Sequence, residues 1–292
     1  MGLTPPGGHP TEYMPESTDE RMQGFAFPFV STPDEATARV AALAGEGADY
    51  IKIFIEDGTA LGVRLPTLST ETLLAAVHEA HRCGKMAIAH ATTADGAQQA
   101  IAAGVDGLAH MYIDAPAKTD LIGAIAGSGV FVTPCLVLNS SVMGNSAAQL
   151  AADDRVRSKL DDKWLESLRS SIGTYPQGNL DAVFAAVLAL HAAGVDVLAG
   201  TDVSEPLPML GGLAHGASLH HELQLLVRAG LTPVEALRAA TAVPARRFGL
   251  TDRGRIAVGA RADLLLVEGD PTRTISDTLS IRAVWRRGAR LN

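Results

Sequence analysis

The chain has 292 residues, of which 47% are hydrophobic, so it can bury the core of one barrel-sized domain with a smaller appendage. Charged residues make up 19% of the chain and aromatic residues 4%, and the formal net charge is −8 without a basic block. A nucleic-acid surface would lack both its cations and its stacking platforms, so we expect no nucleic-acid partner.

Helices are predicted along most of the chain after its first segment. Residues 1–30 are rich in Gly and Pro and show neither helical nor strand periodicity, which predicts a loop. Residues 32–35 (Thr-Pro-Asp-Glu) and 232–235 (Thr-Pro-Val-Glu) each combine a Thr N-cap, a Pro at the first helical position and the Glu of a capping box. Apolar periodicity predicts further helices over residues 70–83, 94–103, 118–128, 147–170, 179–193 and 217–230.

A Gly turn and a short apolar run follow most of these helices. Residues 102–109 and 192–199 are nearly identical, and residues 47–52, 84–90 and 129–134 follow the same pattern. Each Gly serves as the left-handed C-cap that ends a helix before the chain enters the sheet. The alternation is typical of βαβ units and predicts an α/β fold around a parallel sheet, which in a chain of this size can close into a (β/α)8-barrel.

Four reactive side chains stand where the predicted strands end. Counted from the Gly of each turn, Lys52 comes five residues later, His90 and His110 six, and Asp202 eight. The strands of a closed parallel barrel all point the same way, so their carboxyl ends meet at one face, which is the catalytic face of such folds. We therefore expect these four side chains to converge.

The two histidines have the chemistry of metal ligands. Imidazoles on successive strands supply neutral nitrogen donors of the kind that Zn²⁺ prefers, and a catalytic site would leave further positions for oxygen ligands and water. A single histidine at a strand end could equally be a hydrogen-bonded residue of the barrel. Two in matching register, with an aspartate at a third strand end, favour the metal site.

Lys52 lies in an otherwise apolar run, residues 49–55, where a buried lysine must lose its charge, find a partner or be chemically modified. One interpretation is an ion pair with Glu56 or Asp57. The other is carbamylation by CO2, because a desolvated neutral amine is nucleophilic and the product is an anionic oxygen ligand. A nearby cation would hold that modification in place.

Asp202 follows Gly200 and Thr201 at the end of the run 195–199, a poor place for an unpaired carboxylate. It could simply cap the next turn. Near a cation it could instead accept a proton from bound water and pass it to a leaving group. The sequence leaves both roles open.

The pattern changes after about residue 250. Short apolar runs separated by turns, without helices between them, predict strands of a small β-layer. These runs cover residues 254–259, 262–267 and 281–285.

Several motifs together resemble the amidohydrolase superfamily, and within it the imidazolonepropionase-like and prolidase-like branch. The segment from His215 through Thr241 is also similar to that branch, so the resemblance spans nearly the whole chain. The other motifs are residues 51–53 (Ile-Lys-Ile), 89–91 (Ala-His-Ala), 108–110 (Leu-Ala-His), 200–202 (Gly-Thr-Asp) and the tail 254–264.

The resemblance implies a role for each of the four side chains. Lys52 would be a lysine that CO2 converts to a carbamate, which bridges two metal ions in binuclear members. His90 and His110 would be metal ligands, and Asp202 would bind metal and act as the general base. The cofactor would be Zn²⁺ or another divalent metal, as one or two ions. His9, in a Gly-Gly-His motif, and His215 would contact the substrate.

The sequence also departs from the family pattern. The family's first strand carries a His-x-His pair, and the sequence contains no such pair. His220 and His221 are adjacent and therefore do not match this spacing. We expect an N-terminally truncated amidohydrolase barrel over residues 1–250, either a fragment or a natural short form, and strands of a small β-sandwich over residues 251–292. A cation could still be held by the remaining ligands.

The resulting hypothesis is a hydrolase of amide-type C–N bonds in a small-molecule substrate such as a dipeptide, an N-acyl amino acid or a cyclic amide. The alternatives are a catalytically inactive barrel with a binding or subunit role, and an enzyme that uses Lys52 as a Schiff-base amine. Two isolated cysteines and the lack of a leader or an apolar membrane span predict a cytoplasmic protein without a membrane partner. We also expect a homo-oligomer.

Overall fold

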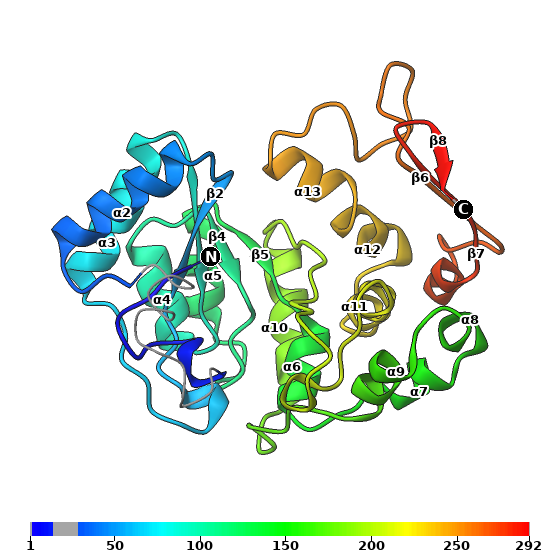
Figure 1. Ribbon diagram of the computed structural model, residues 1–292, viewed down its shortest axis with the longest axis horizontal. Coiled ribbons are helices and arrows are strands. Elements are labelled where there is room, and N and C mark those ends of the chain that lie inside the picture. Colours follow the sequence, from blue (N-terminus) through cyan, green and yellow to red (C-terminus); the bar gives the residue numbers. More distant parts are fainter. Residues whose placement is uncertain (1, 14–28, 292) are drawn as a thin grey trace. The chain divides into compact units, whose positions relative to one another are not determined.

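The computed structural model describes residues 2–13 and 29–291, and the fold is of the predicted α/β class (Figure 1). The chain divides into two compact units. The first unit comprises Met1–Val132 and Ala193–Val195, and the second comprises Thr133–Ala192 and Asp196–Asn292. A closed eight-stranded barrel stays a prediction.

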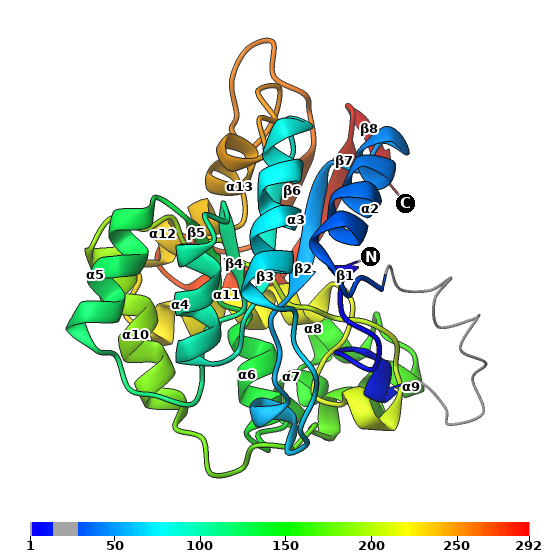
Figure 2. The same cartoon turned by 90° about the vertical axis from the view of Figure 1, so that its left-hand side faces the viewer.

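A five-stranded sheet in the order β1-β2-β3-β4-β5 organises the first unit. The pairs β1/β2, β2/β3 and β3/β4 are parallel. Helices between consecutive strands lie along one face of the sheet (Figures 1 and 2). The strands are β1 (Gly2–Leu3), β2 (Tyr50–Phe54), β3 (Met86–His90), β4 (Gly107–Ala109) and β5 (Phe131–Thr133), and the helices are α2 (Pro33–Gly45), α3 (Thr70–Arg82), α4 (Ala94–Ala102) and α5 (Thr119–Ser128).

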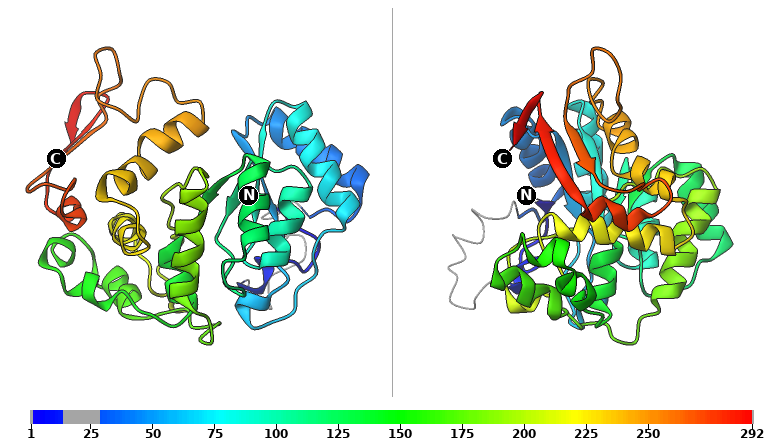
Figure 3. Two further views of the ribbon diagram at one scale, coloured as in Figure 1. Left: turned by 180° about the vertical axis from the view of Figure 1, so that it is seen from behind. Right: turned by 90° about the vertical axis from the view of Figure 1, so that its right-hand side faces the viewer.

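The second unit is mostly helical and ends in a three-stranded antiparallel sheet in the order β6-β7-β8 (Figure 3). Apolar side chains of α7, α9, α11 and the 3-10 helix η4 (Ile275–Leu279) form one of its buried clusters. Its elements are α6 (Leu136–Val142), α7 (Ala148–Ala152), α8 (Asp154–Arg157), α9 (Asp162–Arg169), α10 (Leu180–Ala192), α11 (Ala217–Arg228), α12 (Pro233–Ala239), α13 (Ala242–Arg247), β6 (Leu264–Val267), β7 (Ile281–Arg286) and β8 (Ala289–Leu291).

Both predicted capping boxes are confirmed. The Thr32 side chain accepts the Glu35 backbone N–H at the start of α2, and Thr232 accepts that of Glu235 at the start of α12. The helices predicted over 70–83, 94–103, 118–128, 179–193 and 217–230 are present with ends shifted by one or two residues. None of the described helices is long and apolar enough to cross a membrane.

The helix predicted over 147–170 is instead three short helices. Asp153 ends α7, and its side chain accepts the Arg155 N–H to begin α8. Asp161 accepts the Trp164 N–H to begin α9. Amphipathic periodicity continues across these residues, but an aspartate that bonds to the backbone two or three residues ahead favours a new helix start over continuation.

The N-terminal segment is not all loop. Gly2 and Leu3 pair with Lys52 and Ile53 of β2. A Cβ at position 2 would lie 2.4 Å from the Phe54 ring and 2.9 Å from Cγ of Lys52, so glycine is the residue that lets β1 approach β2 this closely. The part of the predicted loop that covers residues 14–28 lies outside the described residues.

Two predicted strands do not form in the described chain. Residues 195–199 form only an isolated β-bridge, at Val197, and residues 254–259 form no strand. Ile256 is 92% exposed, so the apolar side of that run packs on nothing in the described chain. Apolar alternation predicts a strand only where a neighbouring strand is present to pair with its backbone.

Candidate active site

His90 and His110 lie side by side at the carboxyl ends of adjacent strands. His90 is the last residue of β3, and His110 directly follows β4. The parallel register places His90 opposite Ala109, which brings the next residue beside it. The ring centroids are 4.7 Å apart, and both residues are buried, at 6% and 3% exposure. The sheet therefore pairs the two predicted imidazole ligands.

The surroundings of His90 favour the uncharged ring. Burial away from water lowers its pKa well below the ordinary histidine value, and electrostatic interactions with His9, His110 and Lys52 lower it further. A neutral imidazole keeps a lone pair on one nitrogen, which is the form that binds a metal ion. The site thus holds His90 in a ligand-competent state.

Lys52 lies in the middle of β2, half-buried on the same strand face as Phe54. Its Nζ is 5.8 Å from the centroid of the Phe54 ring. Lys52 also contributes to the low pKa of His90, so its ammonium acts within the same group of side chains. The first unit therefore brings three of the four predicted site residues, Lys52, His90 and His110, close enough to interact electrostatically.

Glu56 also belongs to this group of side chains, although the sequence suggested it only as an ion-pair partner of Lys52. Glu56 is 2% exposed, and its Oε2 lies 3.1 Å from Nε2 of His90. The Thr92 hydroxyl also donates to Oε2, and the Gly58 N–H donates to Oε1 at 2.7 Å. Burial raises the pKa of Glu56, whereas the bonds from Thr92 and Gly58 oppose that rise. The sequence feature that could have identified Glu56 as a site residue is its position two residues after the end of β2.

His9, the predicted substrate contact, lies beside the rings of His90 and Phe54. Its ring centroid is 4.6 Å from that of His90 and 5.1 Å from that of Phe54. Nδ1 of His9 is 2.5 Å from Oε1 of Glu12, so a carboxylate engages this nitrogen. His9 is 9% exposed and therefore belongs to the buried wall of the site.

The side chains of His90, His110 and Lys52 offer donor types that divalent metal ions can bind. Among the residues that the structure describes, no three or more His, Cys, Asp and Glu side chains form a group that could hold a metal ion. His90 and His110 nevertheless provide two adjacent buried imidazoles, and Lys52 is a donor of another type, which becomes an oxygen ligand only after reaction with CO2. The two imidazole nitrogens are donors that suit Zn²⁺ and related divalent ions.

Asp202 and His215 belong to the second unit. Asp202 is exposed and has φ 51°, a left-handed conformation that aspartate tolerates better than most residues. A Cβ at Gly200 would lie 2.3 Å from Cγ2 of Thr133, so glycine lets this loop pass the end of β5. The His215 ring packs edge-on against Trp164, with centroids 4.9 Å apart. The roles of Asp202 and His215 stay predictions.

Glu222 is a buried residue that the sequence did not single out. It lies on α11 with an exposed fraction of 0%. Its two carboxyl oxygens accept the backbone N–H groups of Leu136 and Val137 at 3.0 and 2.9 Å. These are the first two residues of α6, whose N–H groups have no partner within the helix. Glu222 therefore caps a helix 85 residues away in the sequence.

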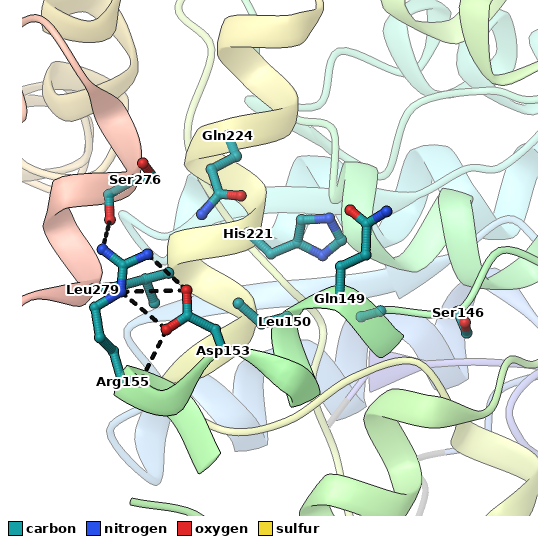
Figure 4. Close-up of a pocket in the computed structure, with 10 residues that line it drawn as sticks. Ser146, Gln149, Leu150, Asp153, Arg155, His221, Gln224, Ser276 and Leu279 are labelled. Atoms are coloured by element: carbon teal, nitrogen blue, oxygen red, sulfur yellow. Dashed lines mark hydrogen bonds and ion pairs between the residues drawn. The ribbon is translucent and has the colours of Figure 1, made fainter. Parts of the chain in front are cut away.

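A cavity of about 240 Å³ in the second unit contains none of the predicted site residues (Figure 4). Arg155 and Asp153 on its wall form an ion pair at 2.6 Å, and Arg155 also donates to the Ser276 carbonyl. Burial lowers the pKa of His221, which lines the same cavity. The charges that line this cavity thus neutralise each other.

A sequence profile of the Amidohydrolase family matches residues 11–291. The chain belongs to the amidohydrolase family. The resemblance seen in the strand-end motifs is thereby confirmed over nearly the whole chain.

Relatives of this amidohydrolase include the imidazolonepropionase of Deinococcus deserti, which is 40% identical over 103 residues, or 34% of this chain and 24% of that protein. The adenine deaminase of Methylobacterium nodulans is 43% identical over 68 residues, or 23% of this chain and 11% of that protein. These alignments span about a quarter or less of either relative.

Solved structures extend the likeness to the fold. A Xaa-Pro dipeptidase with methionine bound in its active site is 23% identical, with a TM-score of 0.73 over 99% of this chain and 66% of that one. A putative prolidase from Bifidobacterium longum is 26% identical, with a TM-score of 0.67 over 92% and 62% of the two chains. The chain thus spans about two thirds of the length of these proteins.

Proposed function

We propose that this amidohydrolase is a metal-dependent hydrolase of amide-type C–N bonds in a small-molecule substrate. The proposed substrates are a dipeptide, an N-acyl amino acid or a cyclic amide. The observation that carries the proposal is the buried pair His90 and His110 at adjacent strand ends, with Lys52 nearby, in a chain of this family. A cytoplasmic location and a homo-oligomeric state belong to the same proposal.

The names of the similar proteins support this reaction class. A dipeptidase cleaves the C–N bond of a peptide, and a deaminase cleaves the C–N bond of an amine, in the proteins that carry those names. Both reactions need an activated water and a proton for the departing nitrogen. The residues of this chain can be assigned to these two tasks.

The proposed roles follow from the chemistry of each side chain. His90, His110, a carbamate on Lys52 and Asp202 would hold Zn²⁺ or another divalent metal, as one or two ions. When bound, the cation would lower the pKa of water and polarise the substrate carbonyl. Asp202 would accept the proton of the attacking water and deliver it to the leaving nitrogen. His9 and His215 would contact the substrate.

The proposal is tested by turnover of a substrate panel. The full chain would be incubated with Xaa-Pro dipeptides, N-acyl amino acids and cyclic amides, before and after treatment with a chelator. We expect hydrolysis of at least one class, loss of that activity after chelation, and its return with Zn²⁺, Mn²⁺ or Fe²⁺. Activity that persists unchanged in metal-free protein would contradict the proposal.

The same panel separates the proposal from its alternative, an inactive amidohydrolase-like barrel with a binding or subunit role. Protein that retains a divalent ion but hydrolyses no member of any class would favour that alternative. A Schiff-base enzyme would differ again, because borohydride reduction with a carbonyl substrate would trap a covalent adduct on Lys52. We expect no such adduct.

A further inference from the structure

One buried carboxylate, that of Glu56, connects the loop after β2 with the end of β3. Its two oxygens contact Nε2 of His90, the Thr92 hydroxyl and the Gly58 N–H. The side chains of Glu56 and His90 are 1% and 7% exposed. Water therefore has little access to this contact, and each polar atom in it depends on its protein partner.

The donors around Glu56 determine which nitrogen of His90 carries the proton. A neutral imidazole has one N–H, so the other nitrogen holds a lone pair. Oε1 of Glu56 accepts from Gly58 and Oε2 accepts from Thr92. An ionised Glu56 carboxylate only accepts hydrogen bonds, so Nε2 of His90 is the donor in its 3.1 Å contact with Oε2. The lone pair is then on Nδ1.

We propose that Glu56 is a positioning residue that holds His90 in the Nε2–H tautomer and makes Nδ1 its cation-binding nitrogen. This inference rests on the proposed function, because it assumes that His90 binds a divalent ion. A carboxylate on the far nitrogen of a ligating histidine fixes the ring and makes the ligand more basic. Glu56 therefore acts through His90 and does not itself touch the reacting atoms.

The surrounding chain holds the ring in this orientation. The Ile55 N–H donates to the His90 carbonyl at 2.9 Å, so the residue before Glu56 is bonded to the backbone of His90. The Phe54 and His9 rings pack against the His90 ring at centroid distances of 5.4 and 4.6 Å. The carboxylate and the imidazole therefore meet between two rigid strand ends, where rotation of either side chain is restricted.

The tautomer can be read without any metal. Long-range ¹H–¹⁵N correlations of the histidine rings would be recorded on the full chain after chelation, at about pH 8, where an ordinary histidine is neutral. His90→Asn would assign the signals. We expect His90 to carry its proton on Nε2. A proton on Nδ1 of His90 in the wild-type protein would overturn the inference, and this result requires no Glu56 variant.

Metal affinity provides the second readout. Competition with a chromophoric chelator would give the Zn²⁺ dissociation constant of each protein. Glu56→Leu, which removes the acceptor, should weaken binding by about 10- to 100-fold, and Glu56→Gln, which keeps one acceptor oxygen, should fall between Leu and wild type. The control is Glu12→Gln, because Glu12 bonds to His9 and should leave the His90 tautomer unchanged.

The outcomes distinguish this inference from the proposed function. Wild-type protein that binds no Zn²⁺ would contradict the proposed function, whereas the tautomer measured in metal-free protein would still decide the geometry around Glu56. Wild-type affinity in Glu56→Leu would overturn the positioning role alone, with the metal site intact.

Discussion

Asp202→Asn is expected to lower kcat by about 10²- to 10⁴-fold, the usual contribution of a positioned proton-transfer group. Asparagine keeps an oxygen of similar shape but cannot take the proton of the attacking water. The fold should be unaffected, because Asp202 is exposed and has φ 51°, a conformation that asparagine also tolerates. The measurement is kcat and KM on the substrate found in the panel, together with the metal content.

Glu205→Gln is the matched control for Asp202→Asn. Glu205 is an exposed carboxylate three residues further along the same loop, so its loss changes the local charge equally. We expect kcat of this variant to stay within about threefold of wild type. If Asp202→Asn were equally active, Asp202 would not be the general base, whatever its part in metal binding.

Glu222→Ala should lower the free energy of unfolding by about 3–5 kcal/mol. Its carboxyl group is the partner of the first two N–H groups of α6, and Leu136 and Val137 are buried. Alanine would leave both donors unsatisfied and create a cavity where the side chain lies. Urea unfolding monitored by circular dichroism measures this loss, and Glu205→Gln again serves as a surface control, expected within about 0.5 kcal/mol of wild type.

Glu222 should also make the free energy of unfolding fall as the pH rises, which is opposite to the usual effect of a carboxyl group in a folded protein. Burial raises the pKa of Glu222 from 4.5 to about 8, with the bonds from Leu136 and Val137 opposing the rise. Its contribution to stability is therefore complete below pH 4.5 and is lost as the pH rises through about 8, because only the unfolded chain ionises freely in between. The loss amounts to at most about 1.4 kcal/mol per pH unit.

Glu222→Gln isolates this effect, because glutamine does not ionise. It should be less stable than wild type at acidic pH, by about 1–3 kcal/mol, since its NH2 group faces a backbone donor. The difference between the two proteins should narrow as the pH rises from 5 toward 8. A difference that widens over this range would show that the carboxylate is the form that the fold stabilises.

Local signals explain what the sequence predicted well. The capping boxes at residues 32–35 and 232–235 act within one helical turn, so they hold in any tertiary context. The glycines that end helices also fix how far the chain travels before the next strand ends. Counting from Gly84 and Gly104 therefore sufficed to place His90 and His110 next to each other.

Distant partners explain what the sequence did not predict. No helix was predicted in the region of α6, because this helix is capped from α11 by Glu222 and no cap is visible near residue 136. Glu56 meets His90 across 34 residues because β2 and β3 are in register, whereas the sequence suggested Lys52, four residues away. Likewise, the run 254–259 has the alternation of a strand without a partner strand in the described chain.

The central claim is that Lys52, His90 and His110 bind a divalent ion, and the metal content of the dialysed full chain tests it most directly. Wild-type protein should hold at least about one equivalent of zinc, manganese or iron, and His90→Ala should lose it. His191→Ala, which removes a histidine 3.2 Å from Glu235 in the second unit, should keep it. Metal-free wild-type protein, or full occupancy in His90→Ala, would contradict the claim.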